Sequence, residues 1–476
     1  MVEFETVIGL EVHAQLLTSS KIFCGCSSAF GAPPNTHGCP VCLGLPGSLP
    51  VLNRMVVEMA IRMGLAVGCA IAQKSIFARK NYFYPDSPKG YQISQYDMPL
   101  CEHGKLPIEV EGVAREIGIT RIHLEEDAGK LVHDQDLDSL FDVNRCGTPL
   151  IEIVSDPEMH SGAEAYAYLT GIKQILQYLA ICDCNMEEGS LRCDANVSIR
   201  PRGQAKLGTK TELKNMNTFR GVEKAIEYEV GRQREIIESG GSVMQQTFLW
   251  DAQKNRTVAM RSKEDAHDYR YFPDPDLLPL IIETPWIAAL KETLPELPHD
   301  KRLRFISVLG LTPYMAEVLT AGPDVAHYFE ETQSIAKDAK LSANWVMGEV
   351  LRLQKEKNVD VASLRVTPRR LATLLNLITD KTLSAHAAKK VFDLIEETDK
   401  DPMTLVEEQG LRQMSDSSAL ENIVREIIEK SPGEVSRFKN GEQKLVSYFV
   451  GQAMKTTKGK GNPQEISKFV MQYLQR

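Results

Sequence analysis

Four cysteines stand in two close pairs near the start of the chain. Cys24 and Cys26 are separated by one glycine, twelve residues follow, and Cys39 and Cys42 then enclose Pro and Val. Thiolates at this spacing suit tetrahedral zinc, and four sulfur ligands leave no open position for water, so we expect a structural zinc site. His37 is an alternative ligand. Four buried free thiols are the competing interpretation, but packing gives no reason for close pairing in a loop rich in Pro and Gly.

The segment VIGLEVHAQL, residues 7–16, predicts a β-strand with one apolar and one polar face. Side chains alternate between the faces of a strand, so Glu11 and His13 share the side opposite Leu10 and Val12. A carboxylate and an imidazole two positions apart are close enough to hold one metal ion. They either share a metal with the nearby cysteines or form a separate site, and the complete set of four cysteines favours a separate site.

Further strand candidates carry a polar face that mixes carboxylates with basic side chains. Its members are Arg121, His123 and Glu125; Glu152; Arg192, Asp194 and Asn196; and Lys210, Glu212 and Lys214. Carboxylates favour a hard cation such as Mg²⁺, and basic side chains neutralise phosphate oxygens. The set predicts a site for a cation together with an anion. The solvated face of an antiparallel sheet would give similar alternation, which is the alternative interpretation.

No common phosphate-binding motif accompanies these strands. Residues 203–210 (GQAKLGTK) approach a P-loop, but Thr209 separates the second glycine from the lysine, and a strand candidate follows. Three loops instead suit nucleic acid, with aromatic beside basic residues in 79–86 and 268–275, and lysines among glycines in 451–463. Alternatively, the aromatic residues of the first two loops only anchor these loops to the protein, and the third loop is a flexible, lysine-containing turn between two helices.

The composition is that of a globular protein with roughly two to four domains. The chain has 476 residues, of which 43% are hydrophobic, and it shows no signal sequence and no apolar run that could span a membrane. Its net charge of -9 argues against a general nucleic-acid coat, although residues 451–476 are basic. Ten cysteines without a disulfide framework favour the reducing cytoplasm.

The period of the apolar residues changes along the chain. Short alternating runs up to about residue 285 predict a mainly antiparallel sheet, interrupted by two helices, one capped by Ser161 and Glu164 and one over residues 219–238. A Pro-rich boundary follows, and then helices, including those that begin after Thr367 and Ser384. A polar break between helices is expected around residues 401–416, and a capping box at Ser418 then predicts the start of a further helix. The fold class is therefore α+β.

Eight long motifs, in the same order along the chain, closely resemble the B subunits of the bacterial glutamyl- and aspartyl-tRNA amidotransferases. They are IGLEVHAQL, RKNYFYPDSPKGYQISQYDMP, HLEEDAGK, NRCGTPLIEIVSDP, MEEGSLRCDANVSIR, ELKNMNTF, DYRYFPDPDLLPL and GQAMKTTKGKGNP. The resemblance implies a cradle-shaped catalytic domain (1–292, containing the zinc loop 24–42), a helical domain (293–408) and a small helical tail domain (409–476).

The resemblance also implies the reaction and its residues. ATP and Mg²⁺ phosphorylate the side-chain carboxylate of Glu or Asp on misacylated tRNA, and ammonia then displaces phosphate. The catalytic residues would be Glu11, His13, Glu125, Glu152, Asp194 and Glu212, with Glu11, His13, Glu125 and Glu152 holding magnesium. The residues touching tRNA or substrate would be Lys80, Tyr82, Tyr84, Arg121 and Lys210, and, in the tail, Met454, Lys455, Lys458, Gly459 and Lys460.

The expected partners are an amidase, which is the A subunit of such a heterotrimer and supplies ammonia through a tunnel, a small C subunit, misacylated tRNA and the cognate aminoacyl-tRNA synthetase. Only part of the family has the four cysteines, so zinc is not needed for the common chemistry. A non-catalytic, zinc-stabilised tRNA-binding scaffold and a metal-dependent nuclease are the alternatives. The sequence does not distinguish Glu-tRNA from Asp-tRNA as the substrate.

Overall fold

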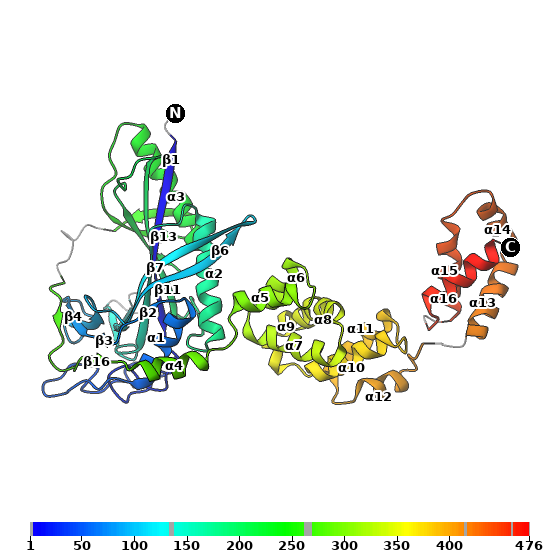
Figure 1. The fold of residues 1–476 in the computed structure, drawn as a ribbon, viewed down its shortest axis with the longest axis horizontal. Coiled ribbons are helices and arrows are strands. Elements are labelled where there is room, and N and C mark those ends of the chain that lie inside the picture. Colours follow the sequence, from blue (N-terminus) through cyan, green and yellow to red (C-terminus); the bar gives the residue numbers. More distant parts are fainter. Residues whose placement is uncertain (1–2, 133–137, 261–268, 414–416, 458–459, 476) are drawn as a thin grey trace. The chain divides into compact units, whose positions relative to one another are not determined.

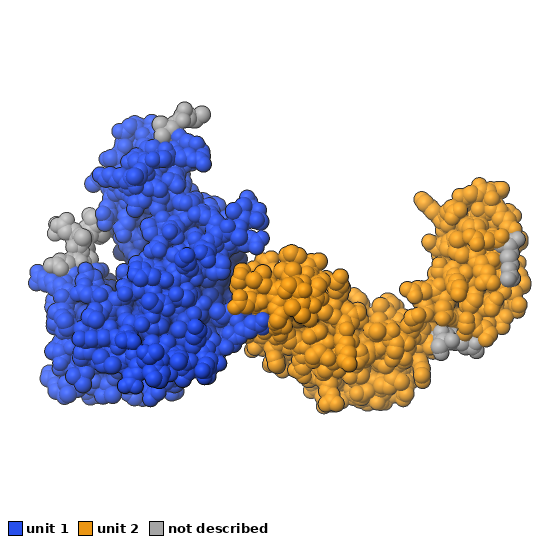
Figure 2. All heavy atoms as spheres, in the orientation of Figure 1, with its two compact units in different colours: residues 1–298 blue, residues 299–476 orange. Residues whose placement is uncertain are grey.

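The computed structural model describes residues 3–132, 138–260, 269–413, 417–457 and 460–475. The chain divides into two compact units, residues 1–298 and 299–476, which Figure 2 colours separately. The first unit combines a large sheet with four helices, and the second is helical (Figure 1). This confirms the predicted α+β class. No described helix is both long and apolar enough to cross a membrane.

A nine-stranded sheet forms the centre of the first unit, in the order β14-β13-β12-β11-β1-β10-β7-β6-β2. All neighbouring strands are antiparallel except β12 and β13, so the prediction of a mainly antiparallel sheet is confirmed. The strands are β1 (Phe4–Gln15), β2 (Ala70–Ile71), β6 (Cys101–Val110), β7 (Val113–Glu126), β10 (Pro149–Ser155), β11 (Leu191–Pro201), β12 (Thr211–Met216), β13 (Thr247–Asp251) and β14 (Arg256–Ala259).

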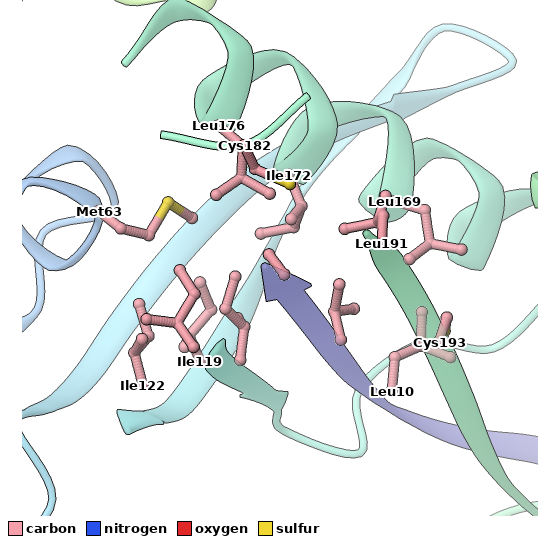
Figure 3. Close-up of a cluster of buried hydrophobic side chains, with 14 of the residues drawn as sticks. Leu10, Met63, Ile119, Ile122, Leu169, Ile172, Leu176, Cys182, Leu191 and Cys193 are labelled. Carbon is pink, nitrogen blue, oxygen red and sulfur yellow. The ribbon is translucent and has the colours of Figure 1, made fainter. Parts of the chain in front are cut away.

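The apolar face of this sheet forms the core with helices α1 (Arg54–Ala66), α2 (Gly162–Tyr178) and α3 (Phe219–Glu238). Ile8, Leu10 and Val12 of β1 are each 0% exposed, as the alternation of this strand predicts. Figure 3 shows Leu10 in this cluster with side chains of β7, β11, α1 and α2. The polar residues of β1 consequently lie on the opposite face of the sheet.

Three smaller sheets surround the large one. The largest has the order β15-β4-β5, and the others pair β16 with β3 and β8 with β9. Their bounds are β3 (Lys74–Ser75), β4 (Phe77–Asn81), β5 (Tyr91–Gln95), β8 (Lys130–Val132), β9 (Leu140–Asp142), β15 (Phe272–Pro273) and β16 (Leu280–Ile281). Strand β5 lies against the end of β7, because the backbone N–H of Ile93 donates to Glu126 Oε1 at 2.8 Å.

The predicted helix starts of the first unit are found, but two helices there are missing from the sequence prediction. Ser161 accepts from the backbone N–H of Glu164 at 3.1 Å, and α3 spans the predicted residues. Helices α1 and α4 (Thr284–Glu292) are the two additional ones. The start of α1 has an ordinary signal, since Asn53 Oδ1 accepts from the N–H of Met55 at 2.9 Å ahead of buried apolar residues.

The second unit consists of α5 (Pro298–Ser307), α6 (Pro313–Leu319), α7 (Pro323–Ala336), α8 (Ala339–Trp345), α9 (Leu351–Lys357), α10 (Pro368–Thr379), α11 (Ala385–Glu397), α12 (Pro402–Glu408), α13 (Ser417–Glu429), α14 (Pro432–Lys439), α15 (Leu445–Thr456) and α16 (Pro463–Leu474), with a π-helical segment (Val346–Val350) and a 3₁₀ turn (Val361–Ser363). Thr367 and Ser384 cap α10 and α11 as predicted. The capping box at Ser418 is wrong, because Ser418 lies within α13 and Glu421 accepts from Tyr473 Oη at 2.8 Å.

Two separate apolar clusters stabilise the second unit. One gathers buried residues between Phe305 and Val406, and the other gathers buried residues between Leu420 and Leu474. The domain boundaries expected at residues 292 and 408 stay predictions.

Candidate active site

Strand register brings the polar residues of four neighbouring strands together around β1. His13 on β1 lies opposite Glu152 on β10, which in turn lies opposite His123 on β7. On the other side of β1, Glu11 lies opposite Asp194 on β11. Directly opposed residues place their side chains on one face of a sheet. Residues far apart in the sequence therefore meet on the face turned away from the core.

The first cluster is the histidine–carboxylate group, consisting of His13, Glu125 and Glu152. One ligand atom of each lies within 4.8 Å of the others. His13 Nε2 lies 3.5 Å from Glu125 Oε1 and 3.2 Å from Glu152 Oε2. The buried His123 adds its Nε2 at 3.3 Å from Glu152 Oε2. With His123 included, two carboxylates face two imidazoles.

Opposing effects set the pKa values in this group. Burial alone would lower the pKa of both histidines, but contact with Glu152 and Glu125 raises it, and that of His123 reaches about 9. Burial would likewise raise the pKa of Glu152, yet the two histidines hold it well below its ordinary value. Glu152 therefore remains charged and attracts cations, here protonated imidazoles.

The second cluster is the three-carboxylate group, consisting of Glu11, Asp194 and Glu212, whose ligand atoms also lie within 4.8 Å of one another. Lys214 Nζ lies 2.5 Å from Asp194 Oδ2 and 2.9 Å from Glu212 Oε1. Asn196 Nδ2 donates to Glu11 Oε1 at 3.0 Å. Burial and the neighbouring carboxylates raise the pKa of Glu11, so negative charge is in excess at this strand.

The basic residues predicted for the site differ in their positions. Lys80 on β4 is half-buried, and Glu125 and Glu152 raise its pKa against the effect of burial, so its ammonium lies near the histidine–carboxylate group. Arg121 lies on β7, two residues before His123 and thus on the same face, and makes no ion pair with the described residues. Lys210 is exposed ahead of β12, and its charge helps to lower the pKa of Glu212.

The structure joins the two aromatic loops, which the sequence presents as unrelated. Strand β4 pairs with β15, and Arg79 Nε and Nη2 each lie 2.8 Å from a carboxylate oxygen, of Asp274 and Asp276 respectively. The backbone N–H of Asn81 donates to Tyr269 O at 2.9 Å. Burial raises the pKa of Tyr271, and Lys80, Glu125 and Glu152 also act on its phenol, so the second loop reaches the histidine–carboxylate group.

Tyr82 and Tyr84 follow β4 in the sequence. Tyr82 is half-buried and lines a small cavity with Asp86, Lys89 and Glu126. Burial and the charge of Asp86 raise the pKa of Tyr82. Tyr84 is 46% exposed, so it is available at the surface of the first unit.

The cysteine group, consisting of Cys24, Cys26, Cys39 and Cys42, is closed and separate from both acidic groups. Its four Sγ atoms lie within 4.8 Å of one another, and those of Cys39 and Cys42 are 3.8 Å apart. Tetrahedral zinc with bonds of about 2.3 Å needs sulfurs roughly 3.8 Å apart, so the thiols fit that ion. A hydrogen bond with Cys24 lowers the pKa of Cys42 to about 4. His37 is not part of the group.

The predicted tail residues lie at the end of α15 and just beyond it. Met454 is half-buried, Lys455 is exposed and Lys460 is half-buried. The backbone N–H of Lys460 donates to Thr457 O at 3.0 Å. Lys458 and Gly459 lie outside the described residues.

Three residues near these groups were not among the expected catalytic or binding residues. His123 and Lys214 alternate with apolar residues on strands already recognised, so their pattern offered a signal. Lys21 stands three positions before Cys24, and nothing in the sequence marks it as buried beside the cysteine group.

Comparisons with known proteins agree with the resemblance of the motifs. Residues 6–288 match the model of the GatB/GatE catalytic domain, and residues 327–474 match that of the GatB domain. The aspartyl/glutamyl-tRNA(Asn/Gln) amidotransferase B subunits from Syntrophotalea carbinolica, Geobacter sp. (strain M21) and Chlorobium chlorochromatii are 54%, 55% and 53% identical to this chain. Each alignment covers 99% of this chain and at least 98% of the relative. The chain therefore belongs to the family of aspartyl/glutamyl-tRNA(Asn/Gln) amidotransferase B subunits.

Proposed function

We propose that this chain is the ATP-dependent catalytic subunit of an amidotransferase, a ligase that converts Glu-tRNA(Gln), Asp-tRNA(Asn) or both to Gln-tRNA(Gln) and Asn-tRNA(Asn). The observation that carries the proposal is the meeting of two acidic groups on one face of β1, with Lys80 beside them. Cation sites next to anion-binding side chains are what phosphoryl transfer requires. The names of the relatives supply the class of substrate.

The donor sets fit magnesium, which prefers carboxylate oxygens. Burial and, after it, the neighbouring carboxylates raise the pKa of Glu11, and a bound cation would lower it again. His13, Glu125 and Glu152 would hold one ion, and Glu11, Asp194 and Glu212 a second, so Glu11 belongs to the second set. Bound Mg²⁺ would neutralise phosphate oxygens during transfer. His13 would lose its proton when it became a ligand.

The chain's own residues would position the two substrates. Lys80 and Arg121 would donate to phosphate oxygens of ATP, and Tyr82, Tyr84 and Lys210 would contact the nucleotide or the tRNA end. An oxygen of the Glu or Asp side chain would then attack the γ-phosphorus, releasing ADP and forming an acyl phosphate. Ammonia would attack the acyl carbon, and phosphate would leave with that side-chain oxygen.

The remaining parts of the reaction belong to partners. The relatives are named as B subunits, which supports an assembly of several different chains. The amidase, as the A subunit, would deliver ammonia, and a small C subunit would brace the assembly. The cognate aminoacyl-tRNA synthetase would supply misacylated tRNA in the cytoplasm. Zinc in the cysteine group would have a structural role only, because four sulfurs leave no position for substrate.

The tail would add affinity for tRNA. We place the domain boundaries at 292/293 and 408/409, which leaves Met454, Lys455, Lys458, Gly459 and Lys460 on the last domain. Removal of residues 417–476 is expected to weaken tRNA binding and to reduce its dependence on salt, because lysines that release counterions from phosphate are lost. Unchanged affinity in a titration at two salt concentrations would contradict this role.

Isotope transfer tests the proposed chemistry. With tRNA that carries Glu labelled by ¹⁸O in its side-chain carboxylate, and with the partner subunits present, released phosphate should contain one ¹⁸O atom. Glu125→Gln should abolish ADP formation while leaving tRNA affinity within about twofold, because it removes charge from the acidic face only. Phosphate without ¹⁸O would exclude acyl phosphate formation. Absence of ADP formation by the unaltered assembly would favour the scaffold alternative.

A further inference from the structure

A buried lysine contacts the cysteine group from the inside. Lys21 is 0% exposed, and its Nζ lies 2.6 Å from His37 O, 3.5 Å from Val143 O and 3.8 Å from Cys42 Sγ. Its backbone N–H donates to Cys26 O at 3.0 Å. Lys21 therefore touches both cysteine pairs and the loop that joins them.

A charged ammonium in this position needs a compensating negative charge, since an isolated buried ion is strongly unfavourable. Among the residues that the structure describes, no carboxylate oxygen lies within 4.0 Å of Lys21 Nζ. The nearby Glu126 is paired with Lys89 instead. The two backbone carbonyls accept hydrogen bonds but carry no net charge. The thiolates of the cysteine group are the remaining source of negative charge.

The negative charge of a metal-loaded cysteine group would compensate the ammonium of Lys21. A divalent ion bound by four thiolates leaves a net charge of about −2 in a partly buried loop. A single ammonium in hydrogen-bonding contact would halve that charge and would donate to the sulfur of Cys42.

We propose that Lys21 is the positioning residue and counter-charge of a metal–thiolate site at Cys24, Cys26, Cys39 and Cys42. Its ammonium neutralises part of the thiolate charge and fixes the loop through the carbonyl of His37. The proposal rests on metal binding by the cysteines and is independent of the proposed enzymatic activity.

In this role, the effect of Lys21 on the stability of the chain depends on whether the metal is bound. In the zinc-loaded chain the ammonium is compensated and stabilises the site. In the metal-free chain the ammonium keeps its two carbonyl partners and the contact with Cys42 but faces fewer thiolates, so its charge is less well compensated and it contributes less to stability. Lys21→Met should therefore lower the unfolding temperature of the loaded chain more than that of the metal-free chain. A lysine that only fills space would give the same loss in both states.

The test uses the full-length chain, with zinc affinity measured by competition against a chromophoric chelator. Lys21→Met and Lys21→Gln should each weaken zinc binding roughly 10–100-fold, as expected for a residue that supports metal ligands. Lys301→Met is the matched control, because Lys301 is a mostly buried lysine of the second unit, 2.7 Å from Glu330. It should leave zinc affinity unchanged. Co²⁺ loading should report four thiolates in the unaltered chain by its sulfur-to-metal charge-transfer absorption.

The possible outcomes test the role of Lys21 separately from the existence of the metal site. Zinc affinity of Lys21→Met and Lys21→Gln equal to that of the unaltered chain would overturn the role of Lys21, as would equal losses of unfolding temperature with and without zinc. Absence of thiolate absorption in the unaltered chain would overturn the metal site itself. If Lys21→Met does not fold, Lys21→Gln decides, because it keeps an N–H donor for the His37 carbonyl while removing the positive charge.

Discussion

The cysteine group and the acidic groups of β1 are both suited to cations, but they are assembled in different ways. The thiols come from one loop, residues 24–42, whereas the acidic groups draw on β1, β7, β10, β11 and β12. The spacing of nearby residues specifies the cysteine group, whereas the register of the sheet specifies the acidic groups. A site specified within one loop therefore depends on fewer elements of the fold than a site assembled from five strands.

The two regions also differ in how their charge is balanced. One buried lysine faces the cysteine group, and its four sulfurs close the site. The acidic groups are balanced only in part, by His13, His123 and Lys214, which are groups that a cation can replace or rearrange. The His13 side chain is 19% exposed, so ligands have access to this face. This access agrees with the proposed binding of substrates at the acidic face.

The largest effect is expected from a variant that removes the cysteine group and leaves the acidic groups intact. Cys39→Ser combined with Cys42→Ser should abolish zinc binding, which would withdraw several kcal/mol of metal-binding free energy from the folded loop. The rate of ATP hydrolysis that depends on misacylated tRNA should stay within about threefold, because no cysteine lies in either acidic group. Metal content, thermal unfolding and ADP formation check these three statements.

Cys69→Ser is the control for that experiment, because Cys69 is a buried cysteine outside the group. It should keep its zinc. Loss of ADP formation together with zinc, in the double variant alone, would show that the two regions are not functionally separate.

A smaller effect is expected on the stability of the metal-free chain, which should depend on pH through His123 in the acidic face. The pKa of His123 is about 9 in the folded chain, against an ordinary value of 6.5. Protonation of His123 therefore contributes stability that is fully present below about pH 6.5 and is lost as pH rises towards about 9, on the order of 3 kcal/mol in total. Urea unfolding of the chelator-treated chain across this range should show the loss, and His123→Gln should remove most of it. Identical pH profiles for the two chains would contradict the assignment.

The smallest expected effect concerns one hydrogen bond within the three-carboxylate group. Asn196→Ala removes the donor to Glu11 Oε1, a bond of 3.0 Å. The loss should be about 1 kcal/mol, seen as a roughly three- to tenfold lower rate of ADP formation, with zinc content unchanged. A normal rate would show that the orientation of Glu11 does not depend on this bond.

Sequence reasoning predicted the elements better than it predicted the assembled site. The alternation in residues 7–16 predicted β1 and its two faces, because a strand with one buried face has a fixed period. The cysteine spacing predicted a group that the structure brings together. Alternation alone does not give strand order, so it could not divide the carboxylates into the sets around His13 and Glu11.

Contacts that depend on the tertiary structure stayed hidden for the same reason. The pairing of β4 with β15 joins loops that lie about 190 residues apart, and no local pattern indicates it. The burial of Lys21 likewise depends on the loop that folds over it, since lysine at an isolated position is ordinarily a surface residue. The missed helix α1 is different, because its Asn53 cap and apolar spacing were present in the sequence.

One side-by-side measurement tests most directly the claim that chemistry belongs to the acidic face and not to the cysteine loop. ADP formation with misacylated tRNA and the partner subunits would be compared for the unaltered chain, Glu125→Gln, and Cys39→Ser with Cys42→Ser. We predict a loss of at least about 1,000-fold for Glu125→Gln and near-normal turnover for the cysteine variant, with tRNA bound by all three. Normal turnover by Glu125→Gln would contradict the claim.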